Sequence, residues 1–271
     1  MVGTKYHIEF PAMGLSFEIN PVAFKIGGIS VYWYGIIIGF GFILAFLYTM
    51  KNSKRFDLDQ DKLIDVIIIG LITGLIGARL YYVIFYPGDM YVKEPTKILF
   101  INQGGIAIYG GIIGAILGGL VVCKIKKLEF LKVLDIASLG FLIGQAIGRW
   151  GNFTNQEAFG TQTDSFFGML SENTGNIAVH PCFLYESVWC AIGFLLLHIF
   201  SLKYKQRFDG EIFLLYVAWY SAGRFFIEGL RTDSLMIPGS GIRVSQVLAA
   251  VAVLVCGLLL IIKKIKQRAY I

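Results

Sequence analysis

The residues best suited to chemistry gather in one stretch, residues 148–160, which reads GRWGNFTNQEAFG. This stretch places Arg149, Asn152, Asn155 and Glu157 where an apolar segment gives way to a polar one. An anchor at a membrane–water boundary needs only an aromatic residue and a basic residue. Two asparagines and a glutamate exceed that need, and ionisable residues at membrane depth usually mark function. We therefore predict a functional site here.

A second group of charges lies later in the chain. Arg224 and Glu228 are four residues apart, so on a helix they share one face, and Arg231 follows them. The simplest interpretation is an ion pair that satisfies itself. In the alternative, the glutamate holds Arg224 ready for an anion, and the planar guanidinium suits phosphate because it donates two parallel hydrogen bonds. Arginines from two apolar segments at similar depth favour this alternative.

Other polar residues receive structural interpretations. Four within or beside apolar segments, each expected to be a hydrogen-bond partner, are Arg79, Asp135, Gln145 and Glu186. No histidine is well placed as a general base, and His180 before Pro181 is typical of a helix cap or interfacial group. The four cysteines show neither C-x-x-C nor zinc spacing, so we predict no metal site. Many glycines are four apart, which favours close helix packing, although Gly110 and Gly111 could leave room for a ligand headgroup.

The elements that position these residues are predicted to be membrane helices. The 271 residues are 56% hydrophobic and only 15% charged, against about 25% charged in a soluble domain. This excludes a disordered chain, a disulfide-rich mini-protein and an ordinary cytosolic enzyme. Seven apolar stretches approach the roughly 20 residues of a membrane helix: 30–50, 63–86, 104–123, 133–148, 183–202, 211–229 and 244–262. We predict an all-α polytopic membrane protein with seven transmembrane helices.

The basic residues predict the orientation. Fifteen of the 24 Lys and Arg residues lie in the segments 51–62, 124–132, 203–207 and 263–268. Basic loops stay in the cytoplasm, so the N-terminus is expected outside and the C-terminus inside. The net charge of +6 is thereby explained without nucleic acid. We expect one domain, residues 1–271, with an outer-surface arm at 1–29 and a small extracytoplasmic head at 151–182.

The arginines and amides thus collect at the outer ends of the fourth and sixth spans. This placement favours a site for an anionic lipid headgroup. The main alternative is a transporter or channel for a small anionic solute, which predicts charges at midplane, broken helices and repeats. Arg79 offers that alternative weak support, and the absence of repeats opposes it. A seven-helix receptor shares only the span count and the orientation.

The stretch 148–160 resembles the signature G-R-x-G-N-F-x-N-x-E-x-x-G of the bacterial prolipoprotein diacylglyceryl transferases. Shorter matches run along nearly the whole chain: Trp33-Tyr34-Gly35, Gly77-Ala78-Arg79, Gly110-Gly111, His180-Pro181 with Tyr185-Glu186, and Gly223-Arg224 with Glu228 and Arg231. The resemblance implies a multi-pass enzyme of the bacterial cytoplasmic membrane, with its active site facing the outer leaflet. It implies transfer of the diacylglyceryl group of phosphatidylglycerol to the lipobox cysteine of a prolipoprotein. The resemblance further implies that a thioether forms, that glycerol 1-phosphate is released, and that no cofactor is needed.

The resemblance also assigns roles. Arg149 and Arg224 would hold the phosphate, and Tyr34 would line the site. The remaining substrate-binding residues would be Asn152, Asn155, Glu157, Gly160, Glu228 and Arg231, with the last two supporting Arg224. Tyr109 is a catalytic candidate that departs from the family, because many relatives have histidine there. A phenol with a pKa of about 10 is a poor base at neutral pH. Tyr109 therefore only hydrogen-bonds the lipid, or the base lies elsewhere, or none is needed.

Overall fold

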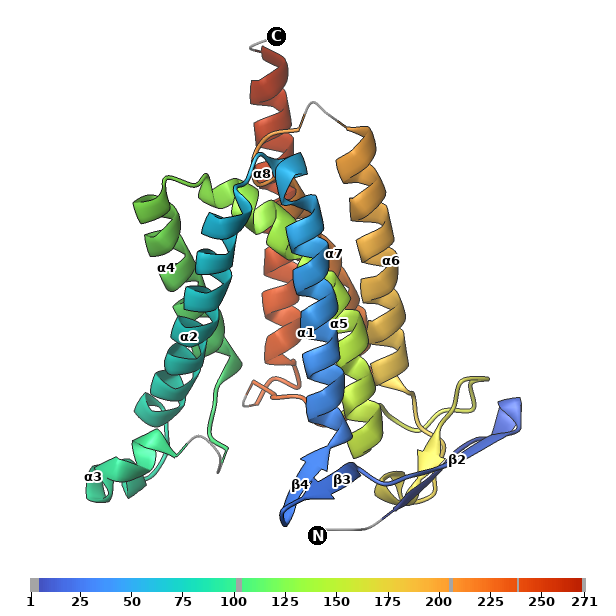
Figure 1. The fold of residues 1–271 in the computed structure, drawn as a ribbon. Helices are drawn as coiled ribbons and strands as arrows, with labels where there is room; N and C mark the ends of the chain where they lie inside the picture. The colour runs from blue at the N-terminus through green and yellow to red at the C-terminus, as the bar shows by residue number, and fades with distance from the viewer. Residues whose placement is uncertain (1–4, 101–103, 205–206, 238, 270–271) are drawn as a thin grey trace. The chain divides into compact units, whose positions relative to one another are not determined.

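The computed structural model describes residues 5–100, 104–204, 207–237 and 239–269 (Figure 1). Residues 1–4 of the predicted arm and Lys205 of a predicted basic loop lie outside these ranges. The chain divides into two compact units. Unit 1 combines Met1–Thr49 with Asp135–Ile271, and unit 2 is Met50–Leu134. The single domain expected over 1–271 stays a prediction.

Each predicted apolar stretch corresponds to a long helix. These helices are α1 (Trp33–Asn52), α2 (Gln60–Ile84), α4 (Ile108–Lys126), α5 (Phe130–Asn155), α6 (Cys182–Lys203), α7 (Glu211–Glu228) and α8 (Val244–Ala269). The shorter helical elements are α3 (Met90–Lys93) and the 3-10 turns η1 (Pro11–Met13), η2 (Ser53–Phe56), η3 (Pro95–Leu99) and η5 (Glu172–Thr174). The protein is mostly helical, as predicted.

Among the described residues, six helices are long and apolar enough to cross a membrane. They are α1, α2, α4, α5, α6 and α8, and they confirm a polytopic membrane protein. Helix α7 is the exception because its 18 residues include Glu211, Arg224 and Glu228. At 1.5 Å per residue it still rises about 27 Å, close to the ~30 Å of a hydrocarbon core. The seventh span and the orientation of the termini stay predictions.

The all-α class needs a correction, because segments at 6–32 and 170–171 form two small antiparallel sheets. Strands β1 (Tyr6–Phe10), β2 (Leu15–Ile19) and β5 (Leu170–Ser171) follow the order β2-β1-β5. Strands β3 (Val22–Ile26) and β4 (Ile29–Tyr32) form a hairpin. Its turn is Gly27-Gly28, and both glycines have positive φ, as hairpin turns of two residues favour. A long apolar run in the sequence reveals a membrane helix, whereas strands this short give no comparable signal.

The pairing of β1 with β5 joins the predicted arm to the predicted head. Ile8 lies opposite Ser171 in this pair. Ile8 and Phe10 point to one face of β1, as strand periodicity requires, and pack with Met169, Val179 and Phe183 in a small core. Phe183 belongs to the first turn of α6, so this core fixes the sheet to the start of that helix.

Within unit 2, glycines allow α2 and α4 to lie side by side (Figure 1). A Cβ atom on Gly110 would overlap the carbonyl oxygen of Gly77 and the Cβ of Tyr81. A Cβ atom on Gly114 would overlap the carbonyl of Thr73. Gly110 therefore serves helix packing, and the room for a headgroup that its sequence suggested is filled by α2.

Within unit 1, polar contacts fix α5 and α7 to each other at the end away from the arginines. The carboxylate of Asp135 on α5 accepts hydrogen bonds from the backbone N–H groups of Gly210 and Phe213, each at 2.9 Å. These groups open α7, where a helix leaves its N–H groups without partners. Helix α1 lies against α5 at Gly41, where an added Cβ would meet Ile147 at 3.3 Å. Asp135 thus has the structural role that the sequence predicted.

Candidate functional site

Three arginines from different parts of unit 1 converge on one carboxylate, Glu186 in the second turn of α6. Arg149, near the end of α5, places Nη2 at 2.6 Å from Oε2 of Glu186. Arg224, near the end of α7, places Nη1 at 3.0 Å from Oε1. Arg231, beyond α7, places Nη1 at 3.6 Å from the same Oε1. We call these four residues, with Glu228 and Asp233, the arginine cluster.

The other two carboxylates of the arginine cluster each hold one arginine. Arg224 pairs through Nη2 with Glu228, one turn later on α7, as the spacing predicted. Arg231 donates two hydrogen bonds to the carboxylate of Asp233, from Nε at 2.8 Å and from Nη2 at 2.6 Å. These bonds lower the pKa of Asp233 below its ordinary value. Three positive and three negative side chains therefore balance, which reduces the cost of burying these charges.

Burial within the arginine cluster is uneven. The side chains of Glu186 and Glu228 are 5% and 2% exposed, whereas those of Arg149 and Arg224 are each 21% exposed. The two carboxylates are thus more deeply buried than the side chains of Arg149 and Arg224, which both remain partly exposed. A guanidinium has five N–H donors, more than its carboxylate partner uses. The arrangement leaves donors of two neighbouring arginines for an anion.

The sequence did not reveal the part that Glu186 plays. Its predicted role was a structural hydrogen-bond partner, and the structure instead makes it the common contact of three arginines. Local spacing could not show this, because the contacts join α5, α6 and the segment after α7. One pattern in the sequence could have indicated this contact. Glu186 lies at the start of one apolar stretch, and Arg149 and Arg224 lie at the ends of the stretches before and after it. Tyr220 was also missed; its hydroxyl accepts a hydrogen bond from Nη2 of Arg149 at 3.4 Å.

The signature stretch turns sharply after α5. Nδ2 of Asn152 donates to Oε1 of Glu157 at 2.9 Å, so these two predicted site residues contact each other. Gln156 and Ala158 adopt left-handed backbone, with φ of 50° and 59°, which is uncommon for residues with a side chain. The turn brings Glu157 back beside the last turns of α5.

Gly160 ends the turn where three segments of the chain meet. Its N–H donates to the carbonyl of His180 at 2.9 Å, and it forms a bridge with Arg231. A Cβ atom here would lie 2.8 Å from the Cβ of His180 and 3.0 Å from Sγ of Cys182. Because Gly160 has no side chain, the backbone segment that carries Arg231 can approach it closely. Its part in substrate binding stays a prediction.

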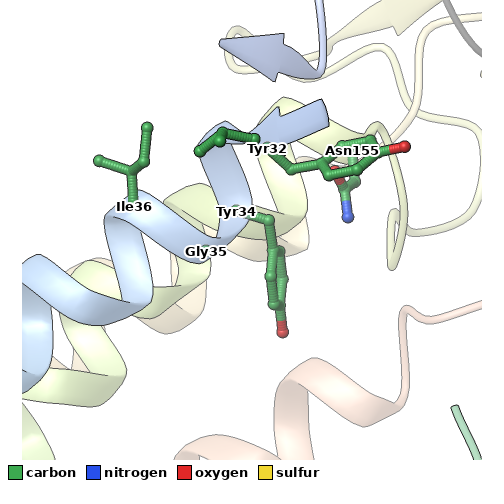
Figure 2. A pocket seen from close by; sticks show the side chains of 6 residues that line it. Tyr32, Tyr34, Gly35, Ile36 and Asn155 are labelled. Carbon is green, nitrogen blue, oxygen red and sulfur yellow. The ribbon is translucent and has the colours of Figure 1, made fainter. Parts of the chain in front are cut away.

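Tyr34 and Asn155 line a shallow cavity of about 630 Å³ at the start of α1 (Figure 2). Its other lining residues are Val31, Tyr32, Gly35 and Ile36. Figure 2 shows the Tyr34 ring extending away from α1. Tyr34 also contacts α5, because a Cβ atom on Gly151 would lie 2.7 Å from Cδ2 of its ring. The structure thus brings Tyr34 to the signature stretch, while its part in lining the site stays a prediction.

Two further candidates belong to unit 2. Tyr109 lies in the first turn of α4, is 49% exposed, and has its ring 6.4 Å from that of Tyr81. Arg79 is 6% exposed and donates hydrogen bonds to five carbonyls, those of Lys97, Ile98, Phe100, Gly104 and Gly105. It is a structural residue that holds the loop before α4. The weak support that Arg79 gave to a transporter is thereby removed.

Two of the lesser candidates in unit 1 make side-chain contacts; Gln145 has the structural role that the sequence predicted, whereas the N-cap position of α6 is Pro181 and not His180. Nε2 of Gln145 donates to the hydroxyl of Tyr216 at 2.9 Å, which links α5 to α7. Nδ1 of His180 lies 3.2 Å from the hydroxyl of Tyr185, one turn into α6.

The apolar helices and the arginine cluster define a polytopic membrane protein with a polar site near one end of its helices. The model of the prolipoprotein diacylglyceryl transferase family matches residues 21–262. The chain is 44% identical over 252 residues to the phosphatidylglycerol–prolipoprotein diacylglyceryl transferase of Clostridium novyi, covering 90% of this chain and 96% of that protein. It is 45% identical over 249 residues to the enzyme of that name from Finegoldia magna, covering 92% and 97%. The chain therefore belongs to the prolipoprotein diacylglyceryl transferase family, and it is a membrane transferase of lipoprotein biosynthesis.

Proposed function

We propose that the arginine cluster binds the phosphate of phosphatidylglycerol while its diacylglyceryl group moves to the lipobox cysteine of a prolipoprotein. The observation that carries this proposal is the convergence of Arg149, Arg224 and Arg231 on Glu186. The relatives supply the substrates, because they are named for phosphatidylglycerol, prolipoprotein and diacylglyceryl transfer.

The phosphate would be held by the two partly exposed arginines. Arg149 and Arg224 both contact Glu186 through one nitrogen each, so the carboxylate sets the separation of their guanidinium groups. A phosphate with two non-bridging oxygens can accept a hydrogen bond from each arginine. Glu228 keeps Arg224 turned toward Glu186. The cluster would thus present preorganised donors to a group whose charge increases during the reaction.

The reaction needs one displacement at carbon. The cysteine sulfur attacks the glyceryl carbon that carries the phosphate, a C–S bond forms, and the C–O bond to the phosphate breaks. The electron pair stays on the phosphate oxygen, glycerol 1-phosphate leaves, and the thiol proton passes to water. The enzyme must align the two substrates and stabilise the leaving phosphate. Nearby cations also favour ionisation of a thiol with an ordinary pKa of about 8.5.

The remaining candidates have supporting roles in this proposal. Tyr34 and Asn155 line the cavity that would receive part of the lipid. The Asn152–Glu157 pair keeps the signature turn closed beside α5. We assign Tyr109 an orienting hydrogen bond to the lipid, because a phenol is almost wholly protonated at pH 7.

The orientation forms part of the proposal. The distribution of basic residues supports an N-terminus outside and a C-terminus in the cytoplasm of a bacterial cell. We propose seven spans in the cytoplasmic membrane, with the cluster facing its outer leaflet. Single cysteines in an otherwise cysteine-free protein test this. Sites in 51–62 and 124–132 should react with an impermeant reagent only after permeabilisation, and sites in 151–182 should react in intact cells. The opposite pattern would reverse the topology.

Arginine variants test the phosphate site directly. Arg149→Ala should abolish transfer to a lipobox peptide while the protein still inserts. Arg149→Lys should also be poor, because lysine lacks the paired donors. Arg55→Ala is the matched control, since Arg55 lies in η2 of unit 2 and donates to Asn52. Near-normal transfer by Arg149→Ala would remove the basis of the proposal.

A further inference from the structure

One sequence pattern, W-x-x-x-G, occurs on both α6 and α7. It places Trp189 four residues before Gly193, and Trp219 four residues before Gly223. Nε1 of Trp189 donates to the backbone carbonyl of Trp219 at 2.9 Å, and Nε1 of Trp219 donates to that of Trp189 at 3.0 Å. The two rings stack with centroids 4.3 Å apart and planes 16° apart. The contact is therefore reciprocal.

The two glycines make this contact possible. A Cβ atom on Gly223 would overlap Nε1 of Trp189, and a Cβ atom on Gly193 would overlap Nε1 of Trp219. Each indole thus occupies the notch that the other helix leaves at its glycine. We call these four residues the tryptophan lock.

We propose that the tryptophan lock is a positioning element that fixes the register of α6 against α7, so that Glu186 meets Arg224. Glu186 lies three residues before Trp189, and Arg224 directly follows Gly223. Glu186, Trp189 and Arg224 line one small void of about 10 Å³. The indole therefore lies directly beside the ion pair, and this inference rests on the proposed function of that pair.

The geometry shows why register matters. The antiparallel helices α6 and α7 bring Nη1 of Arg224 to 3.0 Å from Glu186. A slip of one helical turn displaces a side chain by about 5.4 Å, which would break that contact. In lipid the hydrophobic effect gives little protection against such a slip, because lipid tails are as apolar as leucine. Small residues and hydrogen bonds between helices set register there, and the lock combines both.

The lock is tested by adding one methyl group to either glycine. Gly223→Ala should separate the stacked indoles, abolish their exciton signal in circular dichroism, and displace Arg224 from Glu186. With the purified protein, phosphatidylglycerol vesicles and a lipobox peptide, we expect at least a tenfold higher KM for phosphatidylglycerol. Gly257→Ala on α8 is the matched control, because an added methyl there meets nothing within 4 Å. Gly257→Ala should leave both the exciton signal and the KM for phosphatidylglycerol unchanged.

A second-site variant tests whether overlap with Nε1 of Trp189 causes the defect of Gly223→Ala. Phenylalanine lacks the Nε1 atom that a methyl on Gly223 would overlap, so Trp189→Phe combined with Gly223→Ala should recover activity relative to Gly223→Ala alone. If Gly223→Ala does not fold, Gly193→Ala, in which the added methyl overlaps Nε1 of Trp219, replaces it in the comparison. An unchanged KM after loss of the exciton signal, or no recovery in the double variant, would overturn the lock. Absence of transfer by the wild-type protein would instead overturn the proposed function.

Discussion

Replacement of Glu186 by glutamine is the sharpest perturbation of the arginine cluster. The substitution keeps the size of the side chain but removes its charge and turns one acceptor oxygen into an NH₂ donor. Glu186 forms an ion pair with Arg149 through one oxygen and accepts a hydrogen bond from Arg224 on the other. Glutamine can serve only one of them, and its NH₂ group must face the other guanidinium.

The size of the effect follows from these contacts. A hydrogen bond to a charged group contributes about 1.5–3 kcal/mol, so Glu186→Gln should destabilise the protein by about that amount. Glu186→Ala removes the buried carboxylate beside the partly exposed arginines and should cost up to about 3–5 kcal/mol. Arg224 retains Glu228, and Arg231 retains Asp233. Arg149 loses its carboxylate partner, so its misplacement should lower the transfer rate tenfold to a hundredfold, at about 1.4 kcal/mol per factor of ten.

The assay combines thermal unfolding in detergent with the transfer rate to a lipobox peptide. Glu18→Gln is the matched control, because Glu18 forms an exposed ion pair with Lys5 in which both side chains are about two-thirds exposed. Such pairs contribute little, so this control should behave as wild type. Wild-type stability and rate for Glu186→Gln would refute the view that Glu186 holds the arginines in place.

Three further predictions concern other residues. Gly160→Ala should destabilise the protein by about 1–3 kcal/mol, since the added methyl would lie 2.8 Å from the Cβ of His180; an unchanged unfolding temperature would contradict this. The pKa of Asp233 is lowered, so the stability from its bond to Arg231 is present at neutral pH and is lost only below the ordinary value of about 3.9. Wild type and Asp233→Asn should therefore differ in unfolding temperature equally at pH 7 and pH 5, and a difference that vanishes by pH 5 would oppose it. Tyr109→Phe should slow transfer about tenfold, as loss of one orienting hydrogen bond would, whereas a hundredfold loss with loss of a basic titration limb would make the phenol the base.

The helices could be predicted from the sequence because lipid demands long apolar runs. Each of the seven apolar stretches became a helix. The Arg224–Glu228 pair could also be predicted from the sequence, since a spacing of four residues places both side chains on one helix face. The charges within α7 show the limit of this approach, because a functional helix need not be apolar throughout.

The rest of the site depends on contacts between distant segments. The backbone N–H of His7 donates to the carboxylate of Glu172, 165 residues away, and no local sequence pattern predicts this hydrogen bond. Glu186 looks like an isolated acid in the sequence, and only the packing of α5, α6 and α7 makes it a common contact. The reciprocal use of Trp189 and Trp219 was hidden for the same reason, because it requires two helices in one register.

Mass spectrometry of a lipobox peptide tests the central claim most directly. The purified protein is incubated with the peptide and with phosphatidylglycerol that carries ¹⁸O in the bridge between the glyceryl carbon and phosphorus. We predict that the peptide cysteine gains a diacylglyceryl group without phosphorus, that all of the label leaves in glycerol 1-phosphate, and that Arg149→Ala forms neither product. An unmodified peptide, a phosphorus-containing adduct, or full activity of Arg149→Ala would contradict transfer by displacement at the arginine cluster.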